Sequence, residues 1–342
     1  MNAVELLRVD TRELVTYTSL STYRNCRKKY FWRYVEQLVP LERDDALGLG
    51  SLIHVCLKLW HETGDLNAVL QLIDIETAER ATKDWQRKYR LLARAMMAGY
   101  ATRYPKEEFE VLALEAPFCG EIHNPETGAV SRTFLMGGKY DGLVRLADPV
   151  YLLEHKTASD IGSGYLERLW TDFQVALYLK YVREVLGIEI SGVLYNIIGK
   201  PNLFQAKGET EEEYRVRYAE LCQRNRNGKS SAKRQLPESD EDYERRLCEK
   251  MSDLTMYHRE VLLFSESRIQ EIEAEVWDLT QNLLVSRRTG RWYQNTSFCF
   301  HWNKPCCYYP LCKSGGSELV KSEFYRHEPP HQELREEPEQ GE

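Results

Sequence analysis

The amino-acid sequence predicts an α/β fold, in which a helix-rich amino-terminal region precedes a sheet whose strands are followed by further helices. The first observation is a helix-rich stretch with alternating charge over residues 66–104, which Pro105 ends. The second is a set of apolar runs of strand length, at 109–118, 132–146, 150–157 and 191–198. The third is a pair of later helical segments, at 173–186 and 266–287.

The second and third expected strands are separated by a turn signal at residues 147–149, and we predict that they form an antiparallel hairpin. If the turn centres between positions 147 and 148, Asp141 lies opposite Glu154, with Cβ atoms roughly 4.5–5.5 Å apart on one face. Lys156 shares that face, because strand side chains repeat with a period of two. The hairpin therefore gathers two carboxylates and an ammonium group.

This pair of carboxylates needs a cation or a proton. At a separation of about 5 Å and an effective dielectric constant of about 20, the repulsion is about 3 kcal/mol. Mg²⁺ prefers oxygen ligands and is usually held by one or two carboxylates, with water and substrate phosphate completing its shell. Lys156 would then orient or deprotonate the attacking water, or stabilise charge on the phosphate. The alternative is a surface salt bridge between Lys156 and its acidic neighbours.

Further candidate residues lie on two expected helices. Ser51 is a good N-cap, so a helix over 52–60 would place His54 in its first turn, where a lone histidine is ordinarily structural. Gln174 and Tyr178 are four residues apart in the helix 173–186 and share a face. On the alternative interpretation, they are only the polar edge of a packed helix.

The nine cysteines form the second chemical signal. We expect a reducing cytoplasm, where thiols bind metals more often than they form disulfides. A loop-like segment, SFCFHWNKPCCYYPLC, contains Cys299, Cys306, Cys307 and Cys312, a density that favours metal binding. The dispersed remainder are interpreted as small hydrophobic residues: Cys56, Cys119, Cys222 and Cys248.

Composition limits the possible organisation. With 342 residues, 42% of them hydrophobic, the chain can bury a core as one large domain with insertions. We expect a charged insertion at 200–257 and a disordered acidic tail at 327–342. A net charge of −7 means that nucleic acid would have to bind local basic patches, at 24–33, where aromatic residues are interleaved, or at 224–234. In the first patch, the aromatic residues could instead belong to the core.

The motifs occur in a recognisable order. They are YTSLSTYRNCRKKYFWRYV, GLGSLIHVCL, the Asp141 motif GGKYDG, the Glu-x-Lys motif LLEHKTA, DFQVALY and the cysteine segment. This order resembles the PD-(D/E)XK nuclease superfamily, in particular its RecB-like branch, which includes AddB and the CRISPR-associated four-cysteine exonucleases. The resemblance implies a restriction-endonuclease-like core over residues 1–326, with a central mixed β-sheet flanked by helices and an iron-sulfur-bound carboxy-terminal loop. Tyr140 stands where the superfamily usually has proline, an exchange common in this branch.

The resemblance also implies roles for single residues. Asp141, Glu154 and Lys156 would be catalytic, and Gln174 and Tyr178 would support them and contact the substrate phosphate. The metal ligands would be His54, Asp141, Glu154 and the carbonyl of His155. A [4Fe-4S] cluster would be held by Cys26, Cys299, Cys306 and Cys312, although the Cys-x6-Cys-x5-Cys spacing is wider than in many relatives. The alternatives are a structural zinc site, in which His301 could replace one thiol, and the absence of any metal from this segment.

The implied activity is that of a Mg²⁺- or Mn²⁺-dependent deoxyribonuclease, an exonuclease of phage or prophage type that acts on single strands or duplex ends in recombination, repair or end processing. The sequence contains no Gly-x4-Gly-Lys-Ser/Thr loop, so a helicase would be a separate partner, as would a recombinase or integrase. No membrane association is expected. The alternatives are a CRISPR spacer-acquisition nuclease and a non-catalytic DNA-binding scaffold that keeps the cluster.

Overall fold

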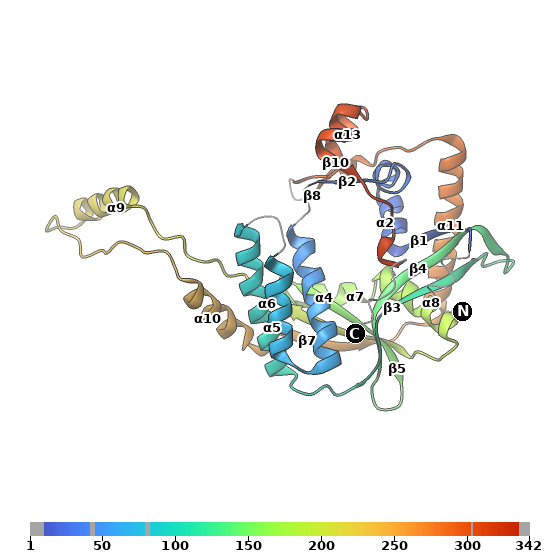
Figure 1. Ribbon diagram of the computed structural model, residues 1–342, viewed down its shortest axis with the longest axis horizontal. Coiled ribbons are helices and arrows are strands. Elements are labelled where there is room, and N and C mark those ends of the chain that lie inside the picture. Colours follow the sequence, from blue (N-terminus) through green and yellow to red (C-terminus); the bar gives the residue numbers. More distant parts are fainter. Residues whose placement is uncertain (1–9, 42–44, 79–82, 302–303, 335–342) are drawn as a thin grey trace.

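The fold is built on one six-stranded mixed sheet, shown by a computed structural model that describes residues 10–41, 45–78, 83–301 and 304–334 (Figure 1). Its strands are β1 (Glu13–Thr16), β3 (Glu110–His123), β4 (Val130–Arg145), β5 (Val150–Ala158), β6 (Gly192–Gly199) and β7 (Tyr257–Leu262). They follow the order β1-β4-β5-β6-β7, and β3 pairs with the other edge of β4. The pairs β1–β4 and β5–β6 are parallel, and the others are antiparallel.

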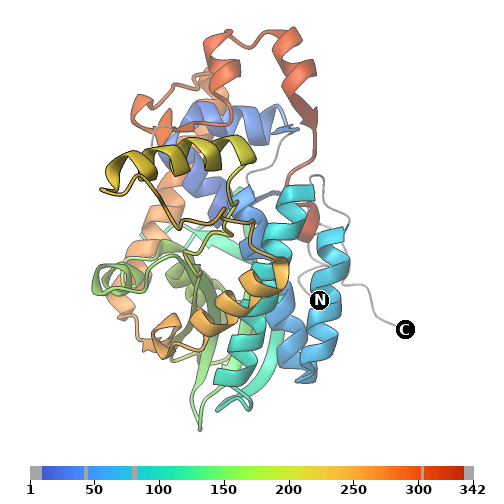
Figure 2. The ribbon, with the colours of Figure 1, turned by 90° about the vertical axis from the view of Figure 1, so that its left-hand side faces the viewer.

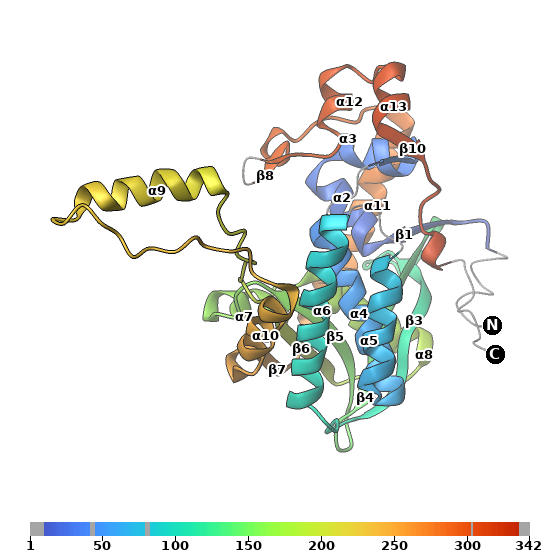
Figure 3. The same cartoon turned by 60° about the vertical axis from the view of Figure 1, so that its left-hand side comes forward.

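Helices cover both faces of this sheet (Figures 1 and 3). One face packs against α2 (Tyr17–Asn25), α8 (Phe173–Leu186) and α11 (Glu266–Thr289). The other carries α4 (Asp45–Thr63), α5 (Leu66–Ala78), α6 (Lys83–Arg103) and α10 (Asp240–Met251). Strand β6 shows why both layers form, because Tyr195 and Ile197 enter the first core whereas Ile198 enters the second.

Several smaller elements complete the described chain. The helical ones are α3 (Arg27–Tyr30), the π-helix η1 (Phe31–Val35), α7 (Ser163–Leu169), α9 (Glu211–Arg224), η2 (Leu254–Met256), η3 (Thr296–Phe298), α12 (Tyr309–Lys313), α13 (Glu318–Phe324) and η4 (Gln332–Leu334). The short strands form two further pairs, β2 (Leu38–Pro40) with β10 (Tyr325–His327) and β8 (Phe300–His301) with β9 (Lys304–Pro305). Within the described ranges, no helix has both the length and the apolar character needed to cross a membrane.

The local signals that defined α8 act as the sequence predicted. Asp172 caps the helix by accepting a hydrogen bond from the backbone N–H of Gln174 at 2.9 Å. Gly187 ends it with φ +63°, a left-handed conformation that glycine adopts without steric penalty. The mixed sheet flanked by helices also agrees with the predicted fold class.

The predicted start of the helix that carries His54 was wrong. Helix α4 begins at Asp45, so Ser51 does not cap it and His54 lies in the middle of the helix. The apolar residues Leu49, Leu52 and Ile53 are buried together, and their packing extends the helix through the glycines that suggested a loop.

The expected insertion at 200–257 divides into parts with different roles. Helix α10 belongs to the core, since Tyr243, Leu247 and Met251 are buried in the cluster formed with α4, α5 and α6. Helix α9 has no buried residue and projects from the body on an extended arm (Figure 1).

The expected tail at 327–342 is ordered over its first part. Strand β10 pairs with β2, and Leu334 is buried with Leu14, Cys119 and Leu135. The remainder of that segment, 335–342, lies outside the described residues.

Candidate active site

The hairpin β4–β5 positions the three charged residues that the sequence singled out. Its register pairs Gly142 with Leu153 and Leu143 with Leu152, which puts Asp141 and Glu154 at opposing positions, as predicted. The side chains of Glu154 and Lys156 share a face, and the Lys156 Nζ lies 2.6 Å from Glu154 Oε1. The alternation of strand side chains therefore assembles the cluster.

Asp141 is held by two donors. The backbone N–H of His155 donates a hydrogen bond to Asp141 Oδ2 at 2.8 Å, and His54 Nδ1 lies 3.3 Å from Asp141 Oδ1. Burial opposes ionisation of Asp141, but the hydrogen bond and charge of His54, together with the backbone N–H of His155, lower its pKa below the usual value. Burial likewise lowers the pKa of His54, and the bond to Asp141 more than offsets this effect. Asp141 is therefore favoured as a carboxylate.

Glu115 is a site residue that the sequence interpretation missed. The β3–β4 pairs Leu114–Gly142 and Ala116–Tyr140 place Glu115 opposite Asp141. One ligand atom each from His54, Glu115 and Asp141 lie within 4.8 Å of one another, and this is the one such metal-competent group in the part of the chain that the structure describes. A carboxylate within the otherwise apolar run VLALEAPFC was the available signal.

The conformation of Glu115 is unusual for a strand residue. Its backbone has φ +47°, in the left-handed region, and its Oε2 pairs with Lys139 Nζ at 2.5 Å. Such backbone conformations are concentrated at functional sites, where the surrounding structure imposes them. The sheet thus holds the Glu115 carboxylate beside Asp141, although the left-handed backbone conformation of Glu115 is unfavourable.

Glu154 lies outside that three-residue group and sits in a different electrostatic environment. Its side chain is buried, and this burial together with the charge of Asp141 raises its pKa to about 7. Burial alone would lower the pKa of Lys156, but the carboxylates of Glu154 and Asp172 raise it above the usual value. Lys156 therefore remains a cation at neutral pH.

Helix α8 brings the two predicted supporting residues to the site. Lys156 Nζ donates a hydrogen bond to Gln174 Oε1 at 3.3 Å and lies 3.6 Å from Asp172 Oδ2. Tyr178 is buried, with its ring 5.1 Å from that of Phe118 in an edge-to-face contact. The end of α8 thus orients the ammonium group of Lys156.

Comparison with protein families shows to which family a chain with this site belongs. Residues 14–296, most of the chain, match the PD-(D/E)XK nuclease superfamily. The chain belongs to this superfamily. Its members are nucleases that cleave phosphodiester bonds and use divalent metals. A comparison with curated proteins found no match to the chain.

Behind the PD-(D/E)XK site lies a buried polar network that the sequence interpretation did not identify. Asn196 on β6 contacts His155 Nδ1 at 2.9 Å through its Nδ2 atom, which also donates to Tyr100 Oη at 3.0 Å. Arg259 donates to Asn196 Oδ1 at 3.0 Å and pairs with Glu107 at 2.7 Å. Because the amide is a donor, the imidazole of His155 accepts at Nδ1. The network therefore holds β5 in place at His155, the residue whose backbone N–H donates to Asp141.

The segments that carry the four predicted cluster cysteines lie beside one another. Burial, together with interactions with Cys26, Cys312 and Cys306, raises the pKa of Cys299. The backbone N–H of Asn295 contacts Cys26 Sγ at 3.5 Å, and the N–H of Cys306 donates to the Cys299 carbonyl at 2.8 Å. Within the described ranges, however, no three of these sulfur atoms lie within 4.8 Å of one another.

The amino-terminal patch at 24–33 is less available to nucleic acid than the base-stacking interpretation requires. Tyr23, Tyr30 and Trp32 are buried, so the aromatic residues that would stack on bases belong to the core. Arg24 forms an ion pair with Glu275 on α11. The interpretation of this segment as an amphipathic helix with core aromatics is therefore the correct one for these residues.

Proposed function

We propose that the chain is a Mg²⁺- or Mn²⁺-dependent deoxyribonuclease. The observation that carries the proposal is the convergence of Asp141, Glu154 and Lys156 with His54 and Glu115 in a member of a nuclease superfamily. The cluster is partly accessible, because the side chains of Asp141, Lys156 and His54 are 12%, 24% and 30% exposed. A substrate phosphate could therefore reach it.

The residues fit a divalent cation. Asp141 and Glu115 offer oxygen atoms and His54 an imidazole nitrogen, a donor set that suits Mg²⁺ or Mn²⁺ with water in the remaining positions. When bound, the ion would polarise the phosphate and lower the pKa of a water molecule. Glu154 could join this set once ionised, and the carbonyl of His155 is the further ligand that the superfamily resemblance implies.

Lys156 supplies the fixed positive charge of the proposed reaction. Because its pKa is raised, it stabilises negative charge on the phosphate and orients the attacking water rather than removing a proton. Glu154 and Gln174 hold the Nζ atom in place from two elements of the fold. Tyr178 packs beside them and would position the substrate.

The experiment is cleavage of end-labelled single-stranded, blunt and overhanging DNA with Mg²⁺ or Mn²⁺. Asp141→Ala, Glu154→Ala and Lys156→Ala should each reduce the rate at least about a thousandfold, whereas Gln174→Ala should cost about ten- to a hundredfold because it acts through positioning. Glu110→Ala is the matched control, since Glu110 lies on β3 but pairs with Arg145 at the exposed end of the sheet. Full activity of folded Glu154→Ala would refute the assignment.

The same assay tests the finer assignments. The order of motifs supports a RecB-like, phage-type exonuclease of recombination, repair or end processing, and digestion confined to DNA ends would agree with it. Cleavage of closed circular DNA would contradict the exonuclease assignment. A CRISPR spacer-acquisition nuclease, or a scaffold without cleavage, is the alternative. We propose a cytoplasmic protein, with a helicase, recombinase or integrase as partner.

We further propose that Cys26, Cys299, Cys306 and Cys312 hold a [4Fe-4S] cluster. The support is their placement as free thiols on adjoining segments, where Cys299 interacts with the other three. Cys306 packs with Cys312 against the same apolar cluster whereas Cys307 is exposed, which favours Cys306 as the ligand.

The cluster can be tested by iron analysis of anaerobically purified protein. We expect about four irons per chain and brown colour, lost in Cys26→Ser but retained in the adjacent-thiol control Cys307→Ser. Colourless protein with one zinc ion would replace the cluster by a structural zinc site. Loss of iron in Cys307→Ser but not in Cys306→Ser would reassign the ligand.

A further inference from the structure

We propose that the projecting arm, defined as residues 200–239, binds the phosphate backbone of DNA outside the catalytic cluster. The inference rests on the proposed function for the identity of the nucleic acid. Its evidence is independent of the catalytic cluster. It comes from the place where the arm leaves the sheet, from the hydrogen bonds within the arm and from the charge of the arm (Figures 1 and 3).

The arm leaves the sheet beside the carboxyl end of β5, close to Glu154 and Lys156. Strands β5 and β6 are parallel, with Lys156 opposite Ile197 and Ala158 opposite Gly199. The arm begins directly after β6, where the backbone N–H of Lys200 donates to the Ala158 carbonyl at 2.7 Å. A polynucleotide strand that passes from the site over this end of the sheet would therefore run toward the arm.

The base of the arm is a defined structure rather than a loose loop. Its two segments are bonded to each other, by Glu209 N–H to the Gln235 carbonyl at 2.9 Å and by Glu238 N–H to the Ala206 carbonyl at 2.9 Å. Gly208, with φ +71°, lies where they meet, and a Cβ there would be 2.5 Å from the backbone nitrogen of Pro237. The segments can approach this closely because position 208 has no side chain.

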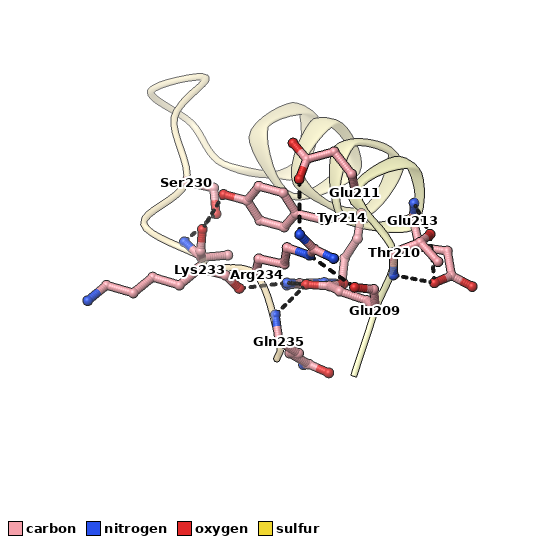
Figure 4. Close-up of polar contacts among 11 residues, drawn as sticks. Glu209, Thr210, Glu211, Glu213, Tyr214, Ser230, Lys233, Arg234 and Gln235 are labelled. Carbon is pink, nitrogen blue, oxygen red and sulfur yellow. Dashed lines mark hydrogen bonds and ion pairs between the residues drawn. The ribbon is translucent and has the colours of Figure 1, made fainter. Parts of the chain in front are cut away.

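Polar contacts also hold α9 against residues 230–235, the segment that leads back from the tip of the arm (Figure 4). Arg217 binds the Glu209 carboxylate through two nitrogen atoms, at 2.7 and 2.5 Å, and Arg234 pairs with Glu211 at 3.2 Å. The hydroxyl of Tyr214 donates to the Ala232 carbonyl at 3.0 Å. The helix therefore keeps its orientation although none of its residues is buried.

This internal pairing leaves the tip strongly basic. Residues 224–234 (RNRNGKSSAKR) contain five cations and no acidic residue, in a chain of net charge −7. Among the described residues, Arg224, Arg226, Lys229 and Lys233 are exposed and have no ion pair with a carboxylate. Figure 4 shows the Lys233 side chain directed away from α9. Four uncompensated cations on a projection whose segments are bonded to each other complement a polyanion.

A protein partner fits this surface less well. The arm exposes only three large apolar residues, Phe204, Val216 and Leu236, which lie far apart in the sequence. By contrast, the five cations of the tip, residues 224–234, form a patch of positive charge only. The arm segment from Lys200 to Glu209 can span at most about 35 Å, and the 14 residues of α9 add about 21 Å at about 1.5 Å per residue. The tip could therefore contact DNA up to about one and a half turns from the scissile bond. Figure 2 views the molecule along this projection.

The test is the salt dependence of binding to a fluorescent 30-base-pair duplex, measured by anisotropy in EDTA so that no cleavage occurs. A variant with alanine at Arg224, Arg226, Lys229 and Lys233 should bind at least about tenfold more weakly at low salt. Its slope of log K against log[salt] should be shallower by about three to four, since each phosphate contact contributes about 0.9. Exchanging lysine for arginine, and the reverse, at these four positions should preserve the slope.

The control removes the same charge from exposed positions on the body, at Lys106, Arg132, Arg288 and Lys313. A slope that changes equally in both alanine variants would overturn the proposal, because only net charge would then matter. An unchanged slope and affinity in the arm variant would overturn it as well and would assign the arm to a protein partner. Because binding is measured without cleavage, a catalytically inactive chain would refute the proposed nuclease but leave this result interpretable.

Discussion

Asp141 and Glu154 show how residues of one chemical type acquire different properties from their neighbours. Asp141 receives hydrogen bonds from His54 and from the His155 N–H, which outweigh its burial and lower its pKa. Glu154 is buried beside Asp141 and Lys156, and burial raises its pKa to about 7. One carboxylate is therefore prepared to bind a cation, whereas the other, even with Lys156 beside it, ionises fully near neutral pH only when a bound ion adds further positive charge.

His61, behind the site, allows a pH-dependent prediction. Its ring stacks on that of His155 with the ring centroids 5.3 Å apart. Its Nδ1 lies 3.5 Å from Glu107 Oε1, but neither ring nitrogen forms a hydrogen bond within the described part of the chain. Burial, with a smaller effect of Arg259, lowers its pKa from 6.5 to about 4. Because the unfolded state binds the proton more tightly, His61 stabilises the fold above pH 6.5, and this contribution is lost as the pH falls toward 4.

The free energy of unfolding of the wild type should fall when the pH is lowered from 7 to 5. We expect this fall to be smaller in His61→Phe by about 2 kcal/mol. The measurement is urea denaturation at the two pH values without metal. Glu154 titrates in the same window in the opposite direction, but it is present in both proteins, so their difference isolates His61. The control is His123→Phe, at a partly exposed position. Equal pH dependence in wild type and His61→Phe would show that His61 is not held neutral.

At the scale of elements, signals confined to a few neighbouring residues were sufficient to predict helix α8 and the hairpin of β4 and β5. The Asp172 cap and Gly187 define α8, and the turn at 147–149 with strand alternation sets the register of β4 and β5. The start of α4 could not be predicted in this way. Its cap signal at Ser51 was outweighed by tertiary packing of the apolar residues around it.

Contacts between elements distant in the sequence account for what was missed at the site. Glu115 reaches Asp141 only because β3 pairs with β4 in one register and adopts a left-handed backbone conformation there. Asn196 meets His155 only because β6 is the neighbour of β5, and Arg259 joins Asn196 because β7 pairs with the other edge of β6. A single sequence shows a polar residue within an apolar run, but it does not show what that residue faces.

At the scale of the whole molecule, charge is distributed unevenly. The chain has a net charge of −7, yet the basic segment 224–234, which contains no acidic residue, projects from the body. The two ends of the described chain also meet, because β2 pairs with β10 and the Tyr308 hydroxyl donates to the Leu38 carbonyl at 2.7 Å. The proposed cluster would reinforce a junction that already exists.

The central claim is that His54, Glu115 and Asp141 together hold a divalent ion, with Glu154 and Lys156 beside it, for phosphodiester cleavage. The most direct measurement is anomalous diffraction from crystals soaked with Mn²⁺, recorded for the wild type and for Asp141→Asn. We predict one strong manganese peak within coordination distance of all three ligands, and its loss in the variant. A wild-type crystal with no manganese at this position, or with a peak that Asp141→Asn leaves unchanged, would contradict the claim.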